Sequence, residues 1–286
     1  MQIIKTIKDL RPVINKYRIN KKSIGFVPTM GALHPAHLSL IKASKKECEC
    51  TVVSIYVNPI QFNDKEDFDS YPRNVNPDTQ MARDAGVDIL FMPEDEEIFP
   101  KESSTFVEIS GHLTNALCGI SRPGHFRGVV TVVCKLFNIV QPDKAYFGMK
   151  DAQQGIVISK MVNDLNSPVE IRLMPTMREE DGLAYSSRNV NLTHEERKKA
   201  AIINQALCHA KKRIMDDKES DAMKVTGEMY EMISKTEGTA IDYISVVSLP
   251  TLEDVKKIKD QVMIAMAVFI GETRLIDNII LNVDKK

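Results

Sequence analysis

Two histidines three positions apart are the first residues here whose types and spacing suggest chemistry. His34 and His37 stand in the stretch GFVPTMGALHPAHLSL, where the apolar run 24–27 leads through Gly31 to a predicted helix starting near Pro35. Proline is favoured in a first helical turn because its missing N–H is not needed there. Backbone N–H groups at a helix start attract phosphate, and two imidazoles on one side of the turn can stabilise phosphoryl charge. We expect a phosphate site here, with two surface histidines as the alternative.

Two glutamines stand after other predicted strands. Gln61 follows the β-branched run 51–57, and Gln154 follows the short strand 144–147 within FGMKDAQQ. The amide of Gln61 both donates and accepts hydrogen bonds, which suits a substrate with hydroxyl and carboxylate groups, and a polar loop is the alternative. Parallel α/β sheets place their ligand crevice at this edge, so we expect both stretches to begin at the same edge of the sheet as the histidines. Gln154 lies one helical turn from Lys150, on the same face.

The stretch FGMKDAQQ also carries groups suited to a phosphate. Gly148 permits close approach of the backbone, and Lys150 can reach a phosphate as a point charge. Asp151 either caps the following helix or binds Mg²⁺ beside the phosphates.

Two basic stretches complete the candidates. Arg127, in GHFR before a predicted helix, is a cation where the helix dipole prefers an anion, so it either neutralises a ligand or is a surface arginine. The stretch REEDGLAYSSRN holds Gly182 and the run Ser186-Ser187-Arg188. Such a loop can close on a polyphosphate, and an interdomain linker is the alternative.

The elements that must position these residues alternate along the first two-thirds of the chain. Predicted strands cover 24–27, 51–57, 87–92, 105–109, 144–147 and 169–174, and predicted helices cover 37–46, 76–85, 129–140 and 151–162. This alternation predicts an α/β fold, a Rossmann-like parallel sheet with helices on both faces.

A smaller C-terminal α+β domain is predicted beyond this sheet. Thr193 and Glu196 form a capping-box pattern that opens a long helical stretch, a second helix covers 221–234, and strand-like runs follow at 241–247, 262–269 and 275–281. We expect the boundary near residues 176–184, so that residues 1–176 form the sheet domain and residues 177–286 form a smaller lid domain.

Composition narrows the classes of protein. The chain has 286 residues, 43% of them hydrophobic, with 38 Lys and Arg against 39 Asp and Glu. The hydrophobic content excludes a disordered chain. The near-balance of basic and acidic residues disfavours nucleic acid as a partner. The longest apolar run, 262–270, is shorter than the about 20 residues that cross a membrane, and no signal-peptide core is visible, so we expect no membrane association and a cytoplasmic location. The five cysteines favour free thiols over disulfides or zinc.

Taken together and in order, the motifs resemble the pantoate–β-alanine ligase family over nearly the whole chain. The matching stretches are PTMGALHPAH, VNPIQF, YPR, RPGHFRGVVTVVCKLFNIVQPD, FGMKDAQQ, DGLAYSSRN and RLIDN. The resemblance implies ATP-dependent condensation of pantoate with β-alanine through a pantoyl adenylate, which releases AMP and pyrophosphate. It also implies that the enzyme is a homodimer and that Mg²⁺ is its cofactor.

The resemblance also implies roles for residues. By the resemblance, His37 would be catalytic, and Gln61 and Gln154 would bind the substrate pantoate. From their chemistry we expect His34, Lys150 and Arg188 to be catalytic as well, Arg127 to bind substrate and Asp151 to hold the metal. Met177 would contact adenine or ribose through its backbone. The whole predicted ATP site is Met30, Gly31, Ala32, Leu33, His34, Pro35, Ala36, His37, Gly148, Met149, Lys150, Asp151, Met177, Tyr185, Ser186, Ser187 and Arg188.

Two positions depart from the family pattern. Ala36 replaces the glycine of the usual H-x-G-H, so its methyl either crowds the nucleotide or is tolerated in a helical backbone. Met149 stands where relatives often have a polar or charged residue, which removes a side-chain contact but not a backbone one.

Two other functions fit part of the pattern. A nucleotide adenylyltransferase would join AMP to a phosphorylated acceptor, but Gln61 and Gln154 disfavour a phosphate acceptor, which would favour Arg or Lys. A nucleotide-sensing module would need the phosphate loops without an acceptor site. Pyrophosphate–ATP exchange with and without pantoate distinguishes all three.

Overall fold

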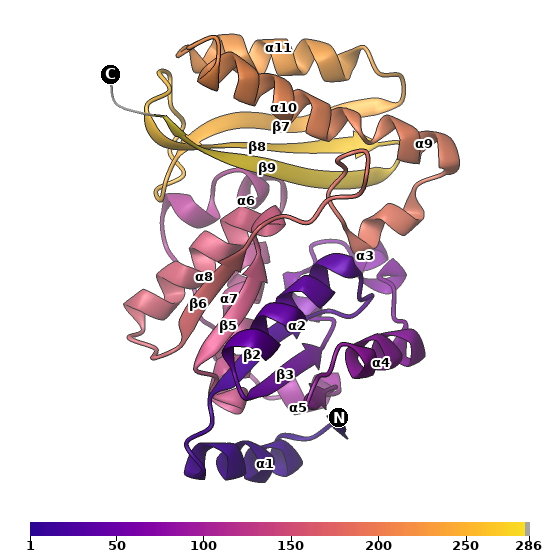
Figure 1. The fold of residues 1–286 in the computed structure, drawn as a ribbon, viewed down its shortest axis with the longest axis vertical. Helices are drawn as coiled ribbons and strands as arrows, with labels where there is room; N and C mark the ends of the chain where they lie inside the picture. Colours follow the sequence, from indigo (N-terminus) through magenta and orange to yellow (C-terminus); the bar gives the residue numbers. More distant parts are fainter. Residues whose placement is uncertain (284–286) are drawn as a thin grey trace. The chain divides into compact units, whose positions relative to one another are not determined.

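The computed structural model describes residues 1–283 and divides the chain into two compact units (Figure 1). The first unit comprises residues 1–109, 122–149 and 153–175, and the second comprises residues 110–121, 150–152 and 176–286. The long segment of the second unit therefore begins at Thr176, and two short earlier segments join it.

A six-stranded parallel sheet forms the centre of the first unit, in the order β1-β4-β3-β2-β5-β6. The predicted α/β class is confirmed. The strands are β1 (Gln2–Ile4), β2 (Ile24–Thr29), β3 (Cys50–Ile55), β4 (Ile89–Phe91), β5 (Lys144–Gly148) and β6 (Glu170–Met174). Since β2 lies between β3 and β5, the carboxyl ends of these three strands are neighbours at one edge of the sheet.

Helices cover both faces of this sheet because successive side chains of a strand point to opposite sides. On one face, Val27, Val53 and Leu90 pack with Ile41 of α2 (Pro35–Glu47) and Ala82 of α4 (Val75–Asp84). On the other face, the ring of Phe137 in α7 (His125–Val140) lies 6.4 Å from the rings of both Phe26 and Phe147. The remaining helices of this unit are α1 (Ile7–Ile19), α3 (Lys65–Ser70), α5 (Asp95–Ile98) and α8 (Ala152–Asp164).

Two predictions for this unit fail. Residues 105–109 form no strand, because the N–H and C=O of Val107 both bond the hydroxyl of Thr131, at 3.0 and 3.1 Å, instead of a neighbouring strand. The helix predicted over 129–140 begins four residues earlier, at His125.

The second unit has a three-stranded antiparallel sheet, β7 (Thr239–Ser248), β8 (Asp260–Ile270) and β9 (Thr273–Val283), in that order. The helices α10 (Ile202–Met215) and α11 (Ala222–Ser234) pack on one face of this sheet (Figure 1). Their apolar residues and those of the strands form one core, which includes Ile203, Leu207, Met229, Ile233, Ile264, Met266 and Val268. A short helix, α6 (Cys118–Ser121), also belongs to this unit.

The predicted capping box is confirmed at the start of α9 (His194–Lys199). The Thr193 hydroxyl accepts from the N–H of Glu196, and the Glu196 carboxylate accepts from the N–H of Thr193. The predicted long helical stretch is interrupted at residues 200–201, after which α10 begins.

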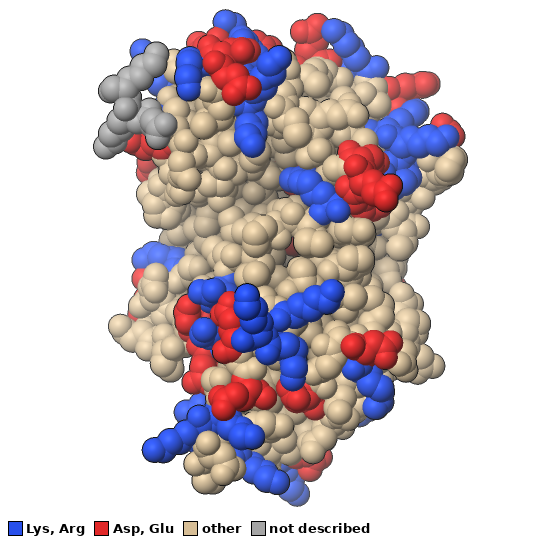
Figure 2. Space-filling model, in the orientation of Figure 1, with Lys and Arg blue, Asp and Glu red and all other residues tan. Residues whose placement is uncertain are grey.

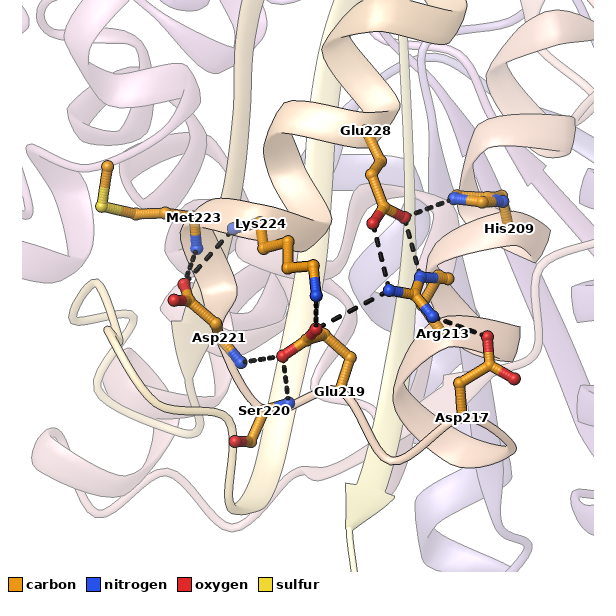
Figure 3. Close-up of polar contacts among 9 residues, drawn as sticks. All are labelled: His209, Arg213, Asp217, Glu219, Ser220, Asp221, Met223, Lys224 and Glu228. Atoms are coloured by element: carbon orange, nitrogen blue, oxygen red, sulfur yellow. Dashed lines mark hydrogen bonds and ion pairs between the residues drawn. The ribbon is translucent and has the colours of Figure 1, made fainter.

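An ion-pair cluster joins α10 to α11 and the turn between them (Figure 3). Glu228 accepts from Arg213 Nε at 2.9 Å and lies 2.7 Å from His209 Nε2, while Lys224 Nζ lies 2.6 Å from Glu219. Lys224 and two backbone N–H groups lower the pKa of Glu219 to about 2.

Basic and acidic side chains lie side by side on the face drawn in Figure 2 rather than in separate fields of one sign. None of the helices within residues 1–283 has the length and apolar character that a membrane-spanning segment requires.

Candidate active site

The histidine loop, residues 30–37, joins β2 to α2 at the carboxyl edge of the parallel sheet. Pro35 is the first residue of α2, as the sequence predicts, and His34 is its N-cap. The loop turns through left-handed backbone at Gly31 (φ +84°) and at Ala32 (φ +49°). A Cβ at Gly31 would lie 3.0 Å from both Asp78 and Ile55, so this turn requires glycine.

Asp78 of α4 fixes this turn, and sequence reasoning missed it. Its carboxylate accepts from the N–H of Ala32 and the N–H of Leu33, both at 2.8 Å, and the residue is 2% exposed. Charge-assisted bonds of this kind are the stronger ones, so Asp78 holds Ala32 in a conformation that a non-glycine residue rarely adopts. Its only sequence signal was an acidic residue in the first turn of a predicted helix.

The two histidine rings lie together at the start of α2, as their spacing predicts. Their centroids are 4.0 Å apart and the ring planes meet at 30°. Both side chains are partly exposed beside a helix N-terminus, where N–H groups favour anions. Ala36 lies inside α2, so its backbone is helical and an alanine adopts it freely.

Gln61 lies against the histidine loop. It ends η1 (Pro59–Gln61), the 3-10 turn after β3, and its Nε2 donates to Met30 Sδ at 3.0 Å. Asn58, which is 1% exposed, donates from Nδ2 to Gln61 Oε1 at 3.0 Å. The buried Oδ1 of Asn58 accepts no hydrogen bond from the described residues. Sequence reasoning missed Asn58, whose only signal was its place at the end of a strand before a proline.

Helix α7 packs closely against η1 and supports it. A Cβ at Gly128 would lie 2.4 Å from the carbonyl oxygen of Ile60 and 2.7 Å from Cα of Gln61, so only glycine lets the two segments approach this closely. The Gly128 carbonyl also accepts from Asn58 Nδ2 at 3.2 Å. The orientation of Gln61 therefore depends on Asn58 and Gly128, which are 70 positions apart in the sequence.

Gln154 and Arg127 occupy the starts of two helices of the first unit. Gln154 is partly buried in the first turn of α8, after β5, the neighbour of β2. Arg127 is exposed in the first turn of α7, and its guanidinium lies 4.0 Å above the ring of Phe106. Gly148 ends β5.

Lys150 and Asp151 belong to the second unit, in the 3-10 turn η3 (Met149–Asp151) that follows Gly148. Lys150 Nζ lies 3.4 Å from Asp151 Oδ1. Among the described residues no three His, Cys, Asp or Glu side chains cluster as a metal site. Mg²⁺ is commonly held by one or two carboxylates together with substrate phosphates, and the partly exposed carboxylate of Asp151 is a group of that type.

The serine loop, residues 177–188, also belongs to the second unit and is closed at its base. The N–H of Tyr185 donates to the carbonyl of Met177 at 3.1 Å, and Ser186 Oγ accepts from the N–H of Arg188 at 3.2 Å. Ser186 thereby caps η4 (Ser187–Asn191), the turn that contains Ser187 and Arg188. Met177 is 40% exposed.

Electrostatic contacts hold the tip of this loop. Arg197 of α9 donates to Asp181 at 2.5 Å and to Glu179 at 2.7 Å. This guanidinium lowers the pKa of Asp181. Asn189 Nδ2 donates to Glu179 Oε1 at 3.0 Å and to the Ala184 carbonyl at 3.1 Å. The tip of the serine loop is therefore held by ion pairs and hydrogen bonds, and its hydroxyl groups and Arg188 lie at the other end.

Comparison with known proteins gives consistent matches over the full length. The family model described as pantoate-beta-alanine ligase matches residues 2–280. A pantothenate synthetase of Acetivibrio thermocellus is 51% identical over 283 residues, covering 99% of this chain and 100% of that protein. One of Caldicellulosiruptor bescii is 50% identical over 280 residues, covering 98% of this chain and 99% of that protein.

Solved structures agree. The pantothenate synthetase of Thermus thermophilus superposes with a TM-score of 0.92 at 40% identity, covering all of both chains. The pantoate-beta-alanine ligase of Francisella tularensis, described as complexed with beta-gamma ATP and beta-alanine, has a TM-score of 0.81 at 37% identity, covering 98% of this chain and 97% of that chain.

Proposed function

The chain belongs to the pantoate–β-alanine ligase family, and on this premise we propose which of its residues bind the substrates and how they act. It is an enzyme that condenses pantoate with β-alanine, using ATP as a substrate. Full-length membership disfavours the adenylyltransferase and nucleotide-sensor alternatives.

The chemistry requires an activated acid. A carboxylate does not react with an amine at neutral pH, because oxide would be its leaving group. Attack of the pantoate carboxylate on the α-phosphorus of ATP releases pyrophosphate and gives an acyl adenylate. The amine of β-alanine then attacks the acyl carbon, and AMP leaves. No protein residue forms a covalent bond, so positioning and charge stabilisation supply the acceleration.

The histidine loop would bind the triphosphate of ATP. The paired rings of His34 and His37 at the start of α2 are the observation that carries this assignment. Imidazole N–H donors and helix N–H groups together favour the negative charge that spreads over the α-phosphate during attack. His37 is the group we place on that phosphate.

Gln61 and Gln154 would hold pantoate beside the histidine loop. The contact of Gln61 with Met30 brings an amide next to the histidine loop, and Asn58 orients that amide. The unused Oδ1 of Asn58 is an acceptor suited to a hydroxyl of pantoate. Arg127 is the guanidinium that we propose for a ligand carboxylate or phosphate.

Lys150 and the serine loop would bind the pyrophosphate half of ATP. A lysine ammonium acts as a point charge on phosphate oxygens, and Ser186, Ser187 and Arg188 donate from side chains at one end of an ordered loop. Asp151 would hold Mg²⁺ on the same phosphates, where the ion supplies neutralising charge. We further propose that the protein is cytoplasmic and that it forms a homodimer. Native mass measurement of the purified protein tests the homodimer.

Pyrophosphate–ATP exchange tests the proposal. The ligase predicts exchange of labelled pyrophosphate into ATP that requires pantoate and does not require β-alanine. Lys150→Ala should lower this exchange about 10²–10³-fold, as loss of one charge-stabilising donor commonly does. Exchange without pantoate, or full exchange by Lys150→Ala, would contradict the assignment.

A further inference from the structure

Two consecutive residues of β9, Asp277 and Asn278, have no part in the steps above, yet both are buried polar residues, at 3% and 8% exposure. They lie in RLIDN, a stretch that the proposed reaction leaves without a role. The Asn278 N–H donates to Asp277 Oδ1 at 2.8 Å, so the two residues are coupled to one another.

Asn278 contacts the segment that carries Lys150. Its Nδ2 donates to the backbone carbonyl of Lys150 at 2.9 Å. This bond fixes the main chain of Lys150 rather than its ammonium group, whose contact is with Asp151 Oδ1 at 3.4 Å. The contact lies entirely within the second unit.

Asp277 contacts the serine loop through Arg178. The guanidinium of Arg178 donates to both carboxylate oxygens of Asp277, at 2.5 and 3.0 Å, and to the Gly182 carbonyl at 3.0 Å. Arg178 also pairs across the loop with Ala184 as an antiparallel bridge. The ion pair therefore fixes both sides of the loop just before Ser186.

We propose that Asp277 and Asn278 are positioning residues that set the placement of Lys150 relative to the serine loop. The inference rests on the proposed function, in which Lys150 and Arg188 contact the same triphosphate. Two cationic groups from separate segments stabilise a transition state only when their spacing is fixed in advance. One rigid strand supplies that spacing by holding the two segments through adjacent residues.

A contribution to stability alone accounts poorly for this arrangement. The Arg178 side chain is 26% exposed, and a partly exposed ion pair contributes little to stability, while the core between α10, α11 and the sheet is already apolar. A bidentate Arg–carboxylate pair instead gives a defined geometry.

The test is pyrophosphate–ATP exchange by Asn278→Ala in the full chain, alone and combined with Lys150→Ala. We expect the single change to lower kcat/KM for ATP about 10–100-fold, because small misplacements of catalytic groups have effects of this size. In the Lys150→Ala background the same change should have an effect below about twofold, because residues that act through one another are not additive. Asp277→Asn combined with Arg188→Ala should behave in the same way.

The matched control is Asn282→Ala on the same strand, since Asn282 accepts from Gln261 at 2.8 Å and is exposed. It should leave exchange unchanged. If Asn278→Ala does not fold, the isosteric Asn278→Asp replaces it, judged by the same criteria.

If Asn278→Ala keeps full exchange while Lys150→Ala is impaired, this inference is overturned and the proposed role of Lys150 stands. An equal loss in both backgrounds would also overturn it, because that result indicates a general structural effect. Full exchange by Lys150→Ala would overturn the proposed role of Lys150 and this inference with it.

Discussion

Replacement of Asp78 by asparagine tests how the histidine loop is held. The carboxylate accepts two backbone N–H groups at 2.8 Å, from Ala32 and Leu33. Asparagine has the same shape but one acceptor oxygen, so one N–H would face an amide donor. A hydrogen bond to a charged group contributes about 1.5–3 kcal/mol, and we expect the free energy of unfolding to fall by at most that amount, because relaxation of the turn offsets part of the loss.

The same change should lower activity, because it frees a strained turn. Ala32 at φ +49° carries about 1–2 kcal/mol of left-handed backbone strain, which relaxes once one of the two bonds is lost. A shift of about 1 Å at the histidines costs on the order of 10² in rate. We therefore expect kcat/KM for ATP to fall about 10–100-fold in the pantoate-dependent exchange.

Urea unfolding and exchange are measured on Asp78→Asn and on Asp84→Asn. Asp84 lies on the same helix and is exposed, and its carboxylate accepts from Gln80 at 2.8 Å. The control should match the unchanged protein in both assays. Unaltered unfolding and unaltered exchange by Asp78→Asn would refute the claim that this carboxylate holds the loop.

Three further predictions concern the site and the second unit. His37→Ala should lower pantoate-dependent exchange about 10²–10³-fold with an unchanged circular dichroism spectrum, and near-normal exchange would count against its phosphate role. Gly128→Ala should destabilise the protein by about 1–3 kcal/mol through overpacking and raise KM for pantoate by displacing Gln61, and an unchanged KM would contradict that contact. Because the folded pKa of Glu219 is lowered to about 2, its stabilisation is present above its ordinary pKa and is lost as pH falls toward 2. Lys224→Ala should therefore reduce stability most at about pH 6, and this reduction should become smaller as the pH falls from 4.5 toward 2 in urea unfolding. A pH-independent difference would refute this reasoning.

The sequence predicts well those helices and strands that are marked by apolar runs and by glycine or proline at their ends. The helix after β2 is predictable because an apolar run, Gly31 and Pro35 mark the turn by local chemistry alone. The three C-terminal strands are likewise visible as apolar runs. Helix α1 escapes prediction, since Pro12 lies inside it and obscures the helical spacing of Leu10 and Ile14.

The residues that orient the candidate site are not predictable in this way. Asp78 reaches the histidine loop across 45 and 46 residues, and Asn58 reaches Gly128 across 70. Such pairs are created by the packing of helices on the sheet, and neither partner carries a local pattern. The false strand at 105–109 has the same origin, because the hydroxyl of Thr131, 24 residues from Val107, takes the place of a neighbouring strand.

The anchor of Lys150 on β9 has a consequence for synthesis of the chain. Asn278 is made 128 residues after Lys150, which at about 5–20 residues per second is a delay of roughly 6–25 s. Every strand of the parallel sheet has left the ribosome's catalytic centre before β9 is begun. A nascent chain can thus assemble that sheet first. The main chain of Lys150 is fixed only later, when Asn278 has been synthesised.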